Sequence, residues 1–199
     1  MKLSHKFQWG KLWTGFSLSI WCNFRKTAEV TGITDACPAT LPFRRVLFLE
    51  YDVKLNDQYL RAELQHIQQK FRLSNIYILE SSKDSYHAYC CDKLSSFEVN
   101  KIIKETSCDD AFRNNWRYDF ACRVLRISEK GSKPKPKYVC CIKSNHNQRQ
   151  KSYPHLIFIK NYFQIPETDM DFTNNDGELI GNKDNAIETI QYPTSHNVT

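Results

Sequence analysis

The run at residues 45–53 is RVLFLEYDV, almost continuously apolar until Glu50. A strand that is apolar on both faces usually lies inside a sheet covered on both sides, so this run predicts a buried central strand. Glu50 and Asp52 are two residues apart, so both carboxylates point to the same face of the sheet. Carboxylates in so apolar a setting are costly without a partner. A hard divalent cation is the natural partner, and a strand that simply ends in solvent is the alternative.

The segments that follow alternate between helical and strand patterns. A helix is expected at 56–71, where Leu60, Leu64, Ile67 and Phe71 recur on one face. A second helix begins at a capping-box pattern, Ser95 to Glu98, and continues to about residue 105. Further strands are expected at 75–80, 85–91, 123–128 and 138–143, and a last element at 155–163. This β-α-β-β-α-β-β order predicts an α+β fold of RNA-recognition-motif-like class, a mostly antiparallel sheet with the helices packed on one face.

Charge and composition divide the chain into three parts. Residues 1–42 are expected to form an extension that packs on the core, and residues 43–165 the main domain. Residues 166–199 are acidic and poor in apolar side chains, so they are expected to be a disordered tail. The formal net charge is +6 even with this acidic tail, so the rest of the chain is strongly basic. A body this basic indicates a polyanionic partner, with solubility as the alternative explanation.

The eight cysteines contain no C-x-x-C pair, which argues against a zinc ribbon or finger. Two adjacent pairs lie in apolar, strand-like runs, where cysteine usually acts as a small buried residue, so free thiols in a reducing, intracellular compartment are expected. Residues 12–24 are rather apolar, but Gly15 and several polar residues interrupt them, unlike a signal peptide. No run reaches transmembrane length, so no membrane partner is expected.

Other candidate site residues come from three later segments. His87 shares a strand face with Ser85 and Tyr89, and it would stand near the acids if its strand lay beside residues 45–53. A hydrogen-bonded surface histidine is the alternative. Asp109 and Asp110 follow the second helix, where the chain can return to the sheet. For these two, the start of another helix is the alternative, because Asp favours the N-cap.

A basic cluster follows, with seven bases and no acid between residues 130 and 151. Lysine and arginine beside a metal centre would hold a triphosphate and a template backbone. A solvated hairpin tip is the alternative.

In this order, the segments resemble the archaeo-eukaryotic primase superfamily, which includes primase-polymerases of plasmids and viruses. Leu49-Glu50-Tyr51-Asp52 is similar to the family's strand-end Asp-x-Asp or Asp-x-Glu motif, and Ser85-Tyr86-His87 to its small-x-His motif. Cys108-Asp109 is similar to the family's hydrophobic-Asp motif, and residues 123–131 to its basic strand. The resemblance covers about residues 44–143. Two departures are Glu50, where Asp is usual, and residues 81–84, which lack the glycines often seen before the histidine motif.

The resemblance implies a DNA primase or primase-polymerase, a metal-dependent nucleotidyltransferase that makes primers in the replication of a small replicon. Its partners would be a single-stranded DNA template and nucleoside triphosphates, with any helicase on another chain, because no G-x-x-x-x-G-K-[ST] loop is present. Glu50, Asp52 and Asp109 would be catalytic and, with Asp110, would hold Mg²⁺ or Mn²⁺. The nucleotide would contact Ser85, His87, Arg126, Ser128 and Lys130. Nucleic acid would contact Arg123, Lys133, Lys135, Lys137 and Lys143, and bases would stack on Tyr89 or Trp116. Asp119 is a weaker candidate acid.

Two alternatives remain from the residues themselves. The first is a single-strand DNA- or RNA-binding module without catalysis, in which acids on the sheet would repel phosphate. The second is a rolling-circle initiator endonuclease, which needs a His-hydrophobe-His metal motif. Residues 85–87 supply only one histidine, so this alternative ranks low.

Overall fold

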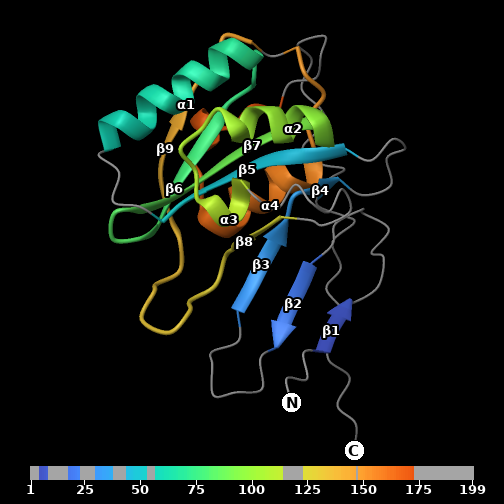
Figure 1. Ribbon diagram of the computed structural model, residues 1–199, viewed down its shortest axis with the longest axis vertical. Helices are drawn as coiled ribbons and strands as arrows, with labels where there is room; N and C mark the ends of the chain where they lie inside the picture. The colour runs from blue at the N-terminus through green and yellow to red at the C-terminus, as the bar shows by residue number, and fades with distance from the viewer. Residues whose placement is uncertain are drawn as a thin grey trace, which may run out of the picture.

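A five-stranded antiparallel sheet in the order β4-β5-β7-β6-β9 lies at the centre of the protein (Figure 1). Its strands are β4 (Ala36–Cys37), β5 (Arg44–Tyr51), β6 (Ile76–Ser82), β7 (Ser85–Ser95) and β9 (Lys137–Ile142). The computed structural model describes residues 5–8, 18–22, 30–37, 44–52, 57–113, 123–146 and 148–172. The expected α+β class with antiparallel strands is confirmed.

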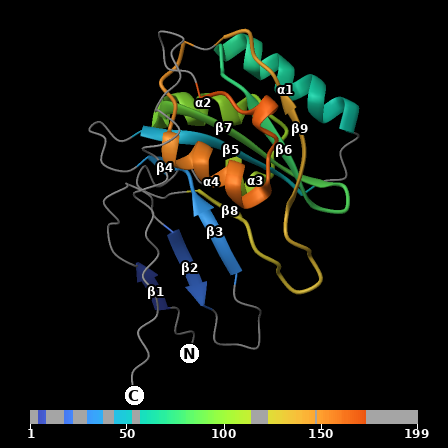
Figure 2. The same cartoon turned by 180° about the vertical axis from the view of Figure 1, so that it is seen from behind.

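Strand β5 is the buried central strand that its apolar run predicts. Val46, Leu47, Phe48 and Leu49 are all at most 1% exposed. The strand pairs with β7 on one side and, through two residues, with the short β4 on the other. β5 is apolar on both faces because helices cover the sheet on both sides (Figures 1 and 2).

The helices α1 (Asp57–Phe71) and α2 (Ser96–Lys104) cover one face of the sheet, and α4 (Tyr153–Phe163) covers the other (Figures 1 and 2). The two faces alternate along β5: Tyr51 donates a hydrogen bond to Glu63 of α1, whereas the ring of Phe48 contacts that of His155 in α4. The prediction that the helices share one face therefore holds for α1 and α2. For α4, the sequence predicted only a last element at 155–163 and assigned it to neither side of the sheet.

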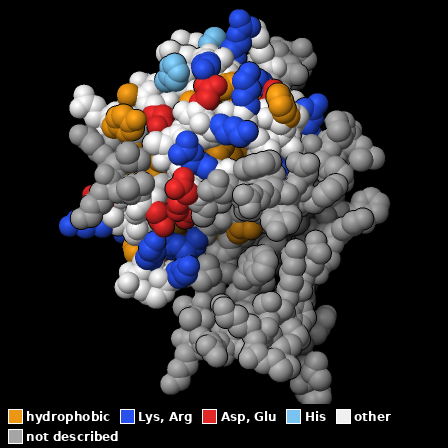
Figure 3. Space-filling view, in the orientation of Figure 1, with side chains coloured by type: hydrophobic (Ala, Val, Ile, Leu, Met, Phe, Trp, Pro, Cys, Tyr) orange, Lys and Arg blue, Asp and Glu red, His pale blue; other side chains and the backbone are white. Residues whose placement is uncertain are grey.

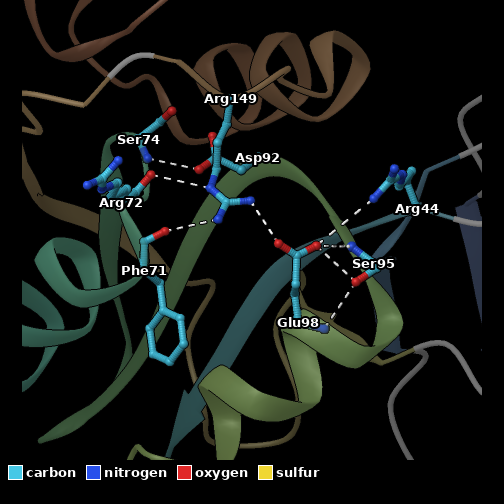
Figure 4. Close-up of polar contacts among 8 residues, drawn as sticks. All are labelled: Arg44, Phe71, Arg72, Ser74, Asp92, Ser95, Glu98 and Arg149. Carbon is cyan, nitrogen blue, oxygen red and sulfur yellow. Dashed lines mark hydrogen bonds and ion pairs between the residues drawn. The ribbon is translucent and has the colours of Figure 1, made fainter.

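The capping box at the start of α2 forms as predicted. The Ser95 hydroxyl accepts a hydrogen bond from the Glu98 backbone N–H at 3.2 Å, and the Glu98 carboxylate accepts one from the Ser95 backbone N–H at 2.9 Å. Glu98 also accepts a hydrogen bond from Arg149 at 3.1 Å (Figure 4). Arg149 donates in turn to the carbonyls of Phe71 and Arg72, so it ties the end of α1 to the start of α2.

A second antiparallel sheet has the order β1-β2-β3-β8, with β1 (His5–Gln8), β2 (Leu18–Cys22), β3 (Val30–Thr34) and β8 (Val124–Arg126). The sequence predicted β8 as a further strand of a single sheet, but β8 pairs with β3 instead. Gly32 allows this pairing, since a Cβ there would lie 2.3 Å from Val124 Cγ1. The N-terminal extension thus supplies three strands of a sheet that β8 completes.

The two sheets meet at Asp35, the residue between β3 and β4. Its carboxylate is fully buried and accepts hydrogen bonds from Arg45 Nη1 at 2.9 Å and from the Arg123 backbone N–H at 3.0 Å. Arg123 Nη1 lies 3.6 Å from the other carboxylate oxygen. Burial raises the pKa of Asp35, and the two guanidiniums act in the opposite direction. We call Asp35, Arg45 and Arg123 the junction.

The C-terminal residues that the structure describes pack against the sheet. Helix η2 (Glu167–Asp169) is followed by Asp171, which pairs with the buried Lys151 at 3.0 Å. Asp169 accepts a hydrogen bond from the Tyr138 hydroxyl at 2.7 Å. The expectation of disorder from residue 166 is therefore wrong for residues 166–172, and residues 173–199 lie outside the described ranges.

The cysteines that the structure describes with their side chains are free thiols, as expected: Cys37, Cys90, Cys91, Cys108, Cys140 and Cys141. Among the described helices, none combines the length and the apolar character that crossing a membrane requires.

Candidate carboxylate site

Glu50 and His87 are directly opposite each other on the paired strands β5 and β7. Glu50 Oε1 lies 3.6 Å from His87 Nε2, and the His87 side chain is 1% exposed whereas that of Glu50 is 26% exposed. The other imidazole nitrogen, Nδ1, lies 3.5 Å from the Tyr89 hydroxyl. The histidine strand thus lies beside the acidic strand, which was the condition for His87 to stand near the acids, and both side chains are on the α4 side of the sheet.

Asp52 follows β5 directly and is exposed, so its carboxylate meets solvent at the rim of the sheet. Lys133 Nζ lies 3.5 Å from Asp52 Oδ1. Lys133 belongs to residues 127–136, which join β8 to β9 and which we call the basic loop (yellow in Figure 1). Lys130 and Lys133 exchange two backbone hydrogen bonds of 3.0 Å across a tight turn, which Gly131 permits with its φ of +59°.

Arg126 fastens the basic loop beside the acids. Its guanidinium donates hydrogen bonds to the carbonyls of Ser81 at 2.5 Å and Pro134 at 2.7 Å, and also to that of Ser128. Burial lowers the pKa of Arg126, and the nearby carboxylates of Glu50 and Asp52 oppose that effect. Arg126 therefore links the β6–β7 turn to the loop while adding positive charge near both acids.

Asp109 is brought to the same end of β5. Its backbone N–H donates to the Glu50 carbonyl at 2.8 Å, so the chain returns to the sheet after α2 as expected. Asp110 begins the short helix α3 (Asp110–Arg113) and lies 3.7 Å from Arg113. A helix therefore begins just after Cys108, as the alternative interpretation of these two acids predicted. The Asp110 side chain is exposed to solvent and is not directed at the buried His87.

Glu63 positions this return of the chain and was not predicted from the sequence. Glu63 is on α1, and its carboxylate accepts the Tyr51 hydroxyl at 2.9 Å and the Ser107 backbone N–H at 3.0 and 3.1 Å. The carboxylate thus holds the end of β5 and the segment before Asp109 together. Its position on the helix face next to Leu60 and Leu64 was the available signal.

A divalent ion would find oxygen ligands at Glu50 and Asp52. In the ranges described, no three His, Cys, Asp or Glu side chains form a ready-made metal cluster. Mg²⁺ is commonly held by one or two protein carboxylates together with substrate phosphates. Two carboxylates on one face beside basic side chains fit that mode of binding, in which a nucleotide supplies the remaining oxygens.

The lysines that were predicted to contact nucleotide or nucleic acid lie in different surroundings. Lys130 and Lys137 are exposed, whereas Lys135 lies 3.9 Å from the centroid of the Tyr162 ring. Lys143 pairs with Asp169 at 3.3 Å, at the opposite end of β9 from the basic loop. On the face drawn in Figure 3, acidic side chains lie directly against basic ones. Lys133 thus lies against Asp52 and Lys135 against Tyr162, whereas Lys143 lies beyond the far end of β9.

Two residues that were predicted to contact nucleic acid are buried, which contradicts the prediction. Arg123 is 4% exposed and its guanidinium binds Asn100 at 2.6 Å and faces Asp35, so it belongs to the junction and not to a nucleic-acid surface. Tyr89 is fully buried between Phe48 and Phe163, so its ring has no free face for a base.

Two residues that were predicted to contact the nucleotide occupy structural positions in or beside the strands. Ser128 accepts a hydrogen bond from the Thr31 backbone N–H at 2.9 Å, which joins the basic loop to β3. Ser85 is only 7% exposed at the start of β7. Trp116 and Asp119 lie outside the residues that the structure describes.

Comparison of the chain with known protein families, curated proteins and solved structures finds no match. Its function is therefore inferred from the placement of its own side chains.

Proposed function

We propose that this chain is a metal-dependent nucleotidyltransferase, a primase or primase-polymerase that extends nucleic acid on a single-stranded DNA template. The observation that carries the proposal is the convergence at the end of β5. Glu50 and His87 are 3.6 Å apart there, Asp52 follows two residues later, and Asp109 is attached to the Glu50 carbonyl. Glu50 and His87 thus meet at the end of β5 to which Asp52 and the backbone of Asp109 also come, which supports the primase resemblance.

The strand arrangement supports the same proposal. Helix α1 connects β5 to β6 along the chain, and β7 follows. In the sheet, β7 lies between β5 and β6. This is the split β-α-β arrangement of RNA-recognition-motif-like folds. Glu50 points to the face of this unit that α4 covers, and Asp52 follows it at the exposed end of β5, where a template and a nucleotide would approach from solvent.

In this proposal, Glu50 and Asp52 hold Mg²⁺ or Mn²⁺, and Asp109 completes the acidic set. The ions, when bound, activate the attacking 3′-hydroxyl and neutralise charge on the phosphates. His87 is 1% exposed and its imidazole lies against Glu50, so in this proposal it orients the Glu50 carboxylate, and the predicted direct contact with the triphosphate is not proposed. Lys130 and Lys133 bring positive charge from the basic loop to the phosphates.

The template would follow the exposed lysines of the basic loop. Lys130, Lys133 and Lys137 are exposed on and beside one loop. Phosphate contacts of this kind are independent of sequence and weaken with salt. A helicase, if the replicon uses one, would be a separate partner.

The test is Mn²⁺-dependent incorporation of labelled nucleotides on a single-stranded DNA template. Wild type is compared with Asp52→Ala and with Glu80→Ala, an exposed strand carboxylate opposite Lys137. Loss of a metal ligand is expected to lower incorporation by at least about 100-fold in Asp52→Ala, since even outer-shell changes cost 10–100-fold. Glu80→Ala should stay near wild type.

Equal incorporation by wild type and Asp52→Ala would refute the enzyme. Template binding by both proteins without any incorporation would favour the non-catalytic binding module. In a binding module, removing the Asp52 charge should preserve or tighten binding, because that charge repels phosphate.

A further inference from the structure

Asp52 already has a cationic partner from its own chain. Its Oδ1 lies 3.5 Å from Lys133 Nζ, and both side chains are almost half exposed, at 42% and 45%. Arg126 adds a second positive charge near Asp52 and Glu50. A metal ion that binds Asp52 therefore enters a site where positive charge is already present.

The two cations differ in how firmly they are held. The guanidinium of Arg126 is fixed by three backbone carbonyls, from Ser81, Ser128 and Pro134. The ammonium of Lys133 has a long contact to one exposed carboxylate and a flexible four-carbon stem. An exposed pair of this kind contributes only about 0–1 kcal/mol. Lys133 is thus the cation that an incoming ion can displace.

The backbone of Lys133 keeps its place while the side chain moves. Its N–H and carbonyl are paired with Lys130 across the loop turn at 3.0 Å. Arg126 holds the same loop through the carbonyls of Ser128 and Pro134 and also binds the Ser81 carbonyl of β6, so a displaced ammonium stays within reach of the acids. A displaced ammonium needs another anionic partner, and a phosphate of a nucleotide bound to the ion would supply one.

We propose that Lys133 is an exchangeable counterion of Asp52: a divalent ion displaces its ammonium, which then binds a nucleotide phosphate. This inference rests on the proposed function, because it assigns Asp52 to the metal. It makes metal and nucleotide binding cooperative, since the ion releases the cation that the phosphate needs. By linkage, the nucleotide strengthens metal binding by the same factor.

The test measures binding, not turnover. Mn²⁺ affinity is measured without nucleotide, by electron paramagnetic resonance of the free ion, on full-length wild type, Lys133→Gln and Lys135→Gln. Lys135 is the matched control, because it is on the same loop but its ammonium rests on the Tyr162 ring. Removing the competing ammonium should tighten Mn²⁺ binding two- to fivefold in Lys133→Gln, the range of one exposed ion pair. Lys135→Gln should equal wild type.

A second measurement uses a fluorescent nucleoside triphosphate with a non-hydrolysable α,β-bridge, at saturating Mn²⁺. Its affinity should fall two- to fivefold in Lys133→Gln and stay unchanged in Lys135→Gln. Mn²⁺ binding by Lys133→Gln that equals or falls below wild type overturns the inference, as does absence of Mn²⁺ binding from both proteins. If nucleotide incorporation is absent while both binding results are as expected, the enzyme proposal fails and the counterion inference stands. The two failures are therefore distinguishable.

Discussion

The junction and the carboxylate site both pair carboxylates with cations, but they do so in opposite settings. Asp35 is fully buried and accepts two hydrogen bonds of 2.9 and 3.0 Å. Asp52 is exposed, and its Oδ1 lies 3.5 Å from Lys133 Nζ. Short bonds in a buried place fix one arrangement, whereas a long contact in water allows partners to exchange. The first setting suits a structural joint and the second suits a site that takes up ligands.

The energetics follow from desolvation. Removing one partner of a buried ion pair leaves an uncompensated charge and costs about 3–5 kcal/mol, whereas an exposed pair contributes about 0–1 kcal/mol. Mutations at the junction should therefore change stability, and mutations at the site should change ligand binding. Stability measurements on variants of both regions test this difference.

The largest effect is expected at the junction. Asp35→Ala should lower the free energy of unfolding by about 3–5 kcal/mol, because Arg45 and Arg123 are left buried without their carboxylate. Urea unfolding followed by circular dichroism measures the change. A loss below about 1 kcal/mol would mean that the junction is energetically no different from a surface pair.

A somewhat smaller effect is expected from pH at His155, which lies beside the junction. His155 Nε2 contacts the Thr34 carbonyl at 2.9 Å, and Nδ1 lies 2.6 Å from the Ser152 hydroxyl. Burial lowers the pKa of His155 from 6.5 to about 4, so the folded state holds the neutral imidazole. This stabilisation is complete above pH 6.5 and is lost as pH falls toward 4, because the unfolded chain takes up the proton first. The loss should reach about 3 kcal/mol.

Unfolding free energies of wild type and His155→Gln between pH 7 and 4 measure this contribution. The variant should show a shallower decline than wild type over that interval. His66→Gln, which changes an exposed histidine, should keep the wild-type slope. Parallel curves for wild type and His155→Gln would contradict the assignment.

The smallest effect is expected at the carboxylate site. Asp52→Asn and Lys133→Gln should each change the free energy of unfolding by less than about 1 kcal/mol, and their double-mutant coupling should be about 0.2–1 kcal/mol. The coupling should shrink further in 1 M salt, which screens exposed charges. A coupling above about 2 kcal/mol would place this pair in the same class as the junction.

Local patterns in the sequence predicted most of the central sheet and its helices. The expected strand at 45–53 is β5 (Arg44–Tyr51), the helix at 56–71 is α1 (Asp57–Phe71), and the Ser95–Glu98 capping box starts α2. Periodicity and capping act within a few residues, so they are visible in the chain itself. The sequence indicated that His87 would come near Glu50 and Asp52 if the two strands were neighbours, and the strands are neighbours in the sheet.

The sequence contains no comparable local pattern that indicates which distant segments pair with each other. Asp35 and Arg123 are 88 residues apart, and nothing near either residue indicates that they meet. Arg123 was therefore interpreted as part of a surface cluster, since charge alone does not reveal burial. The partner of β8 was missed for the same reason, because it depends on strands in a region whose tryptophan-rich sequence has no clear period.

The basic loop starts from a strand of one sheet and ends in a strand of the other, since β8 pairs with β3 and β9 pairs with β6. Any tilt of the smaller sheet against the larger one would therefore shift the loop's ammonium groups relative to Glu50 and Asp52. Asp35 resists such a tilt at the point where the sheets touch. A buried residue with no access to ligand thus helps Arg126 to hold the cations of the loop in place beside the acids.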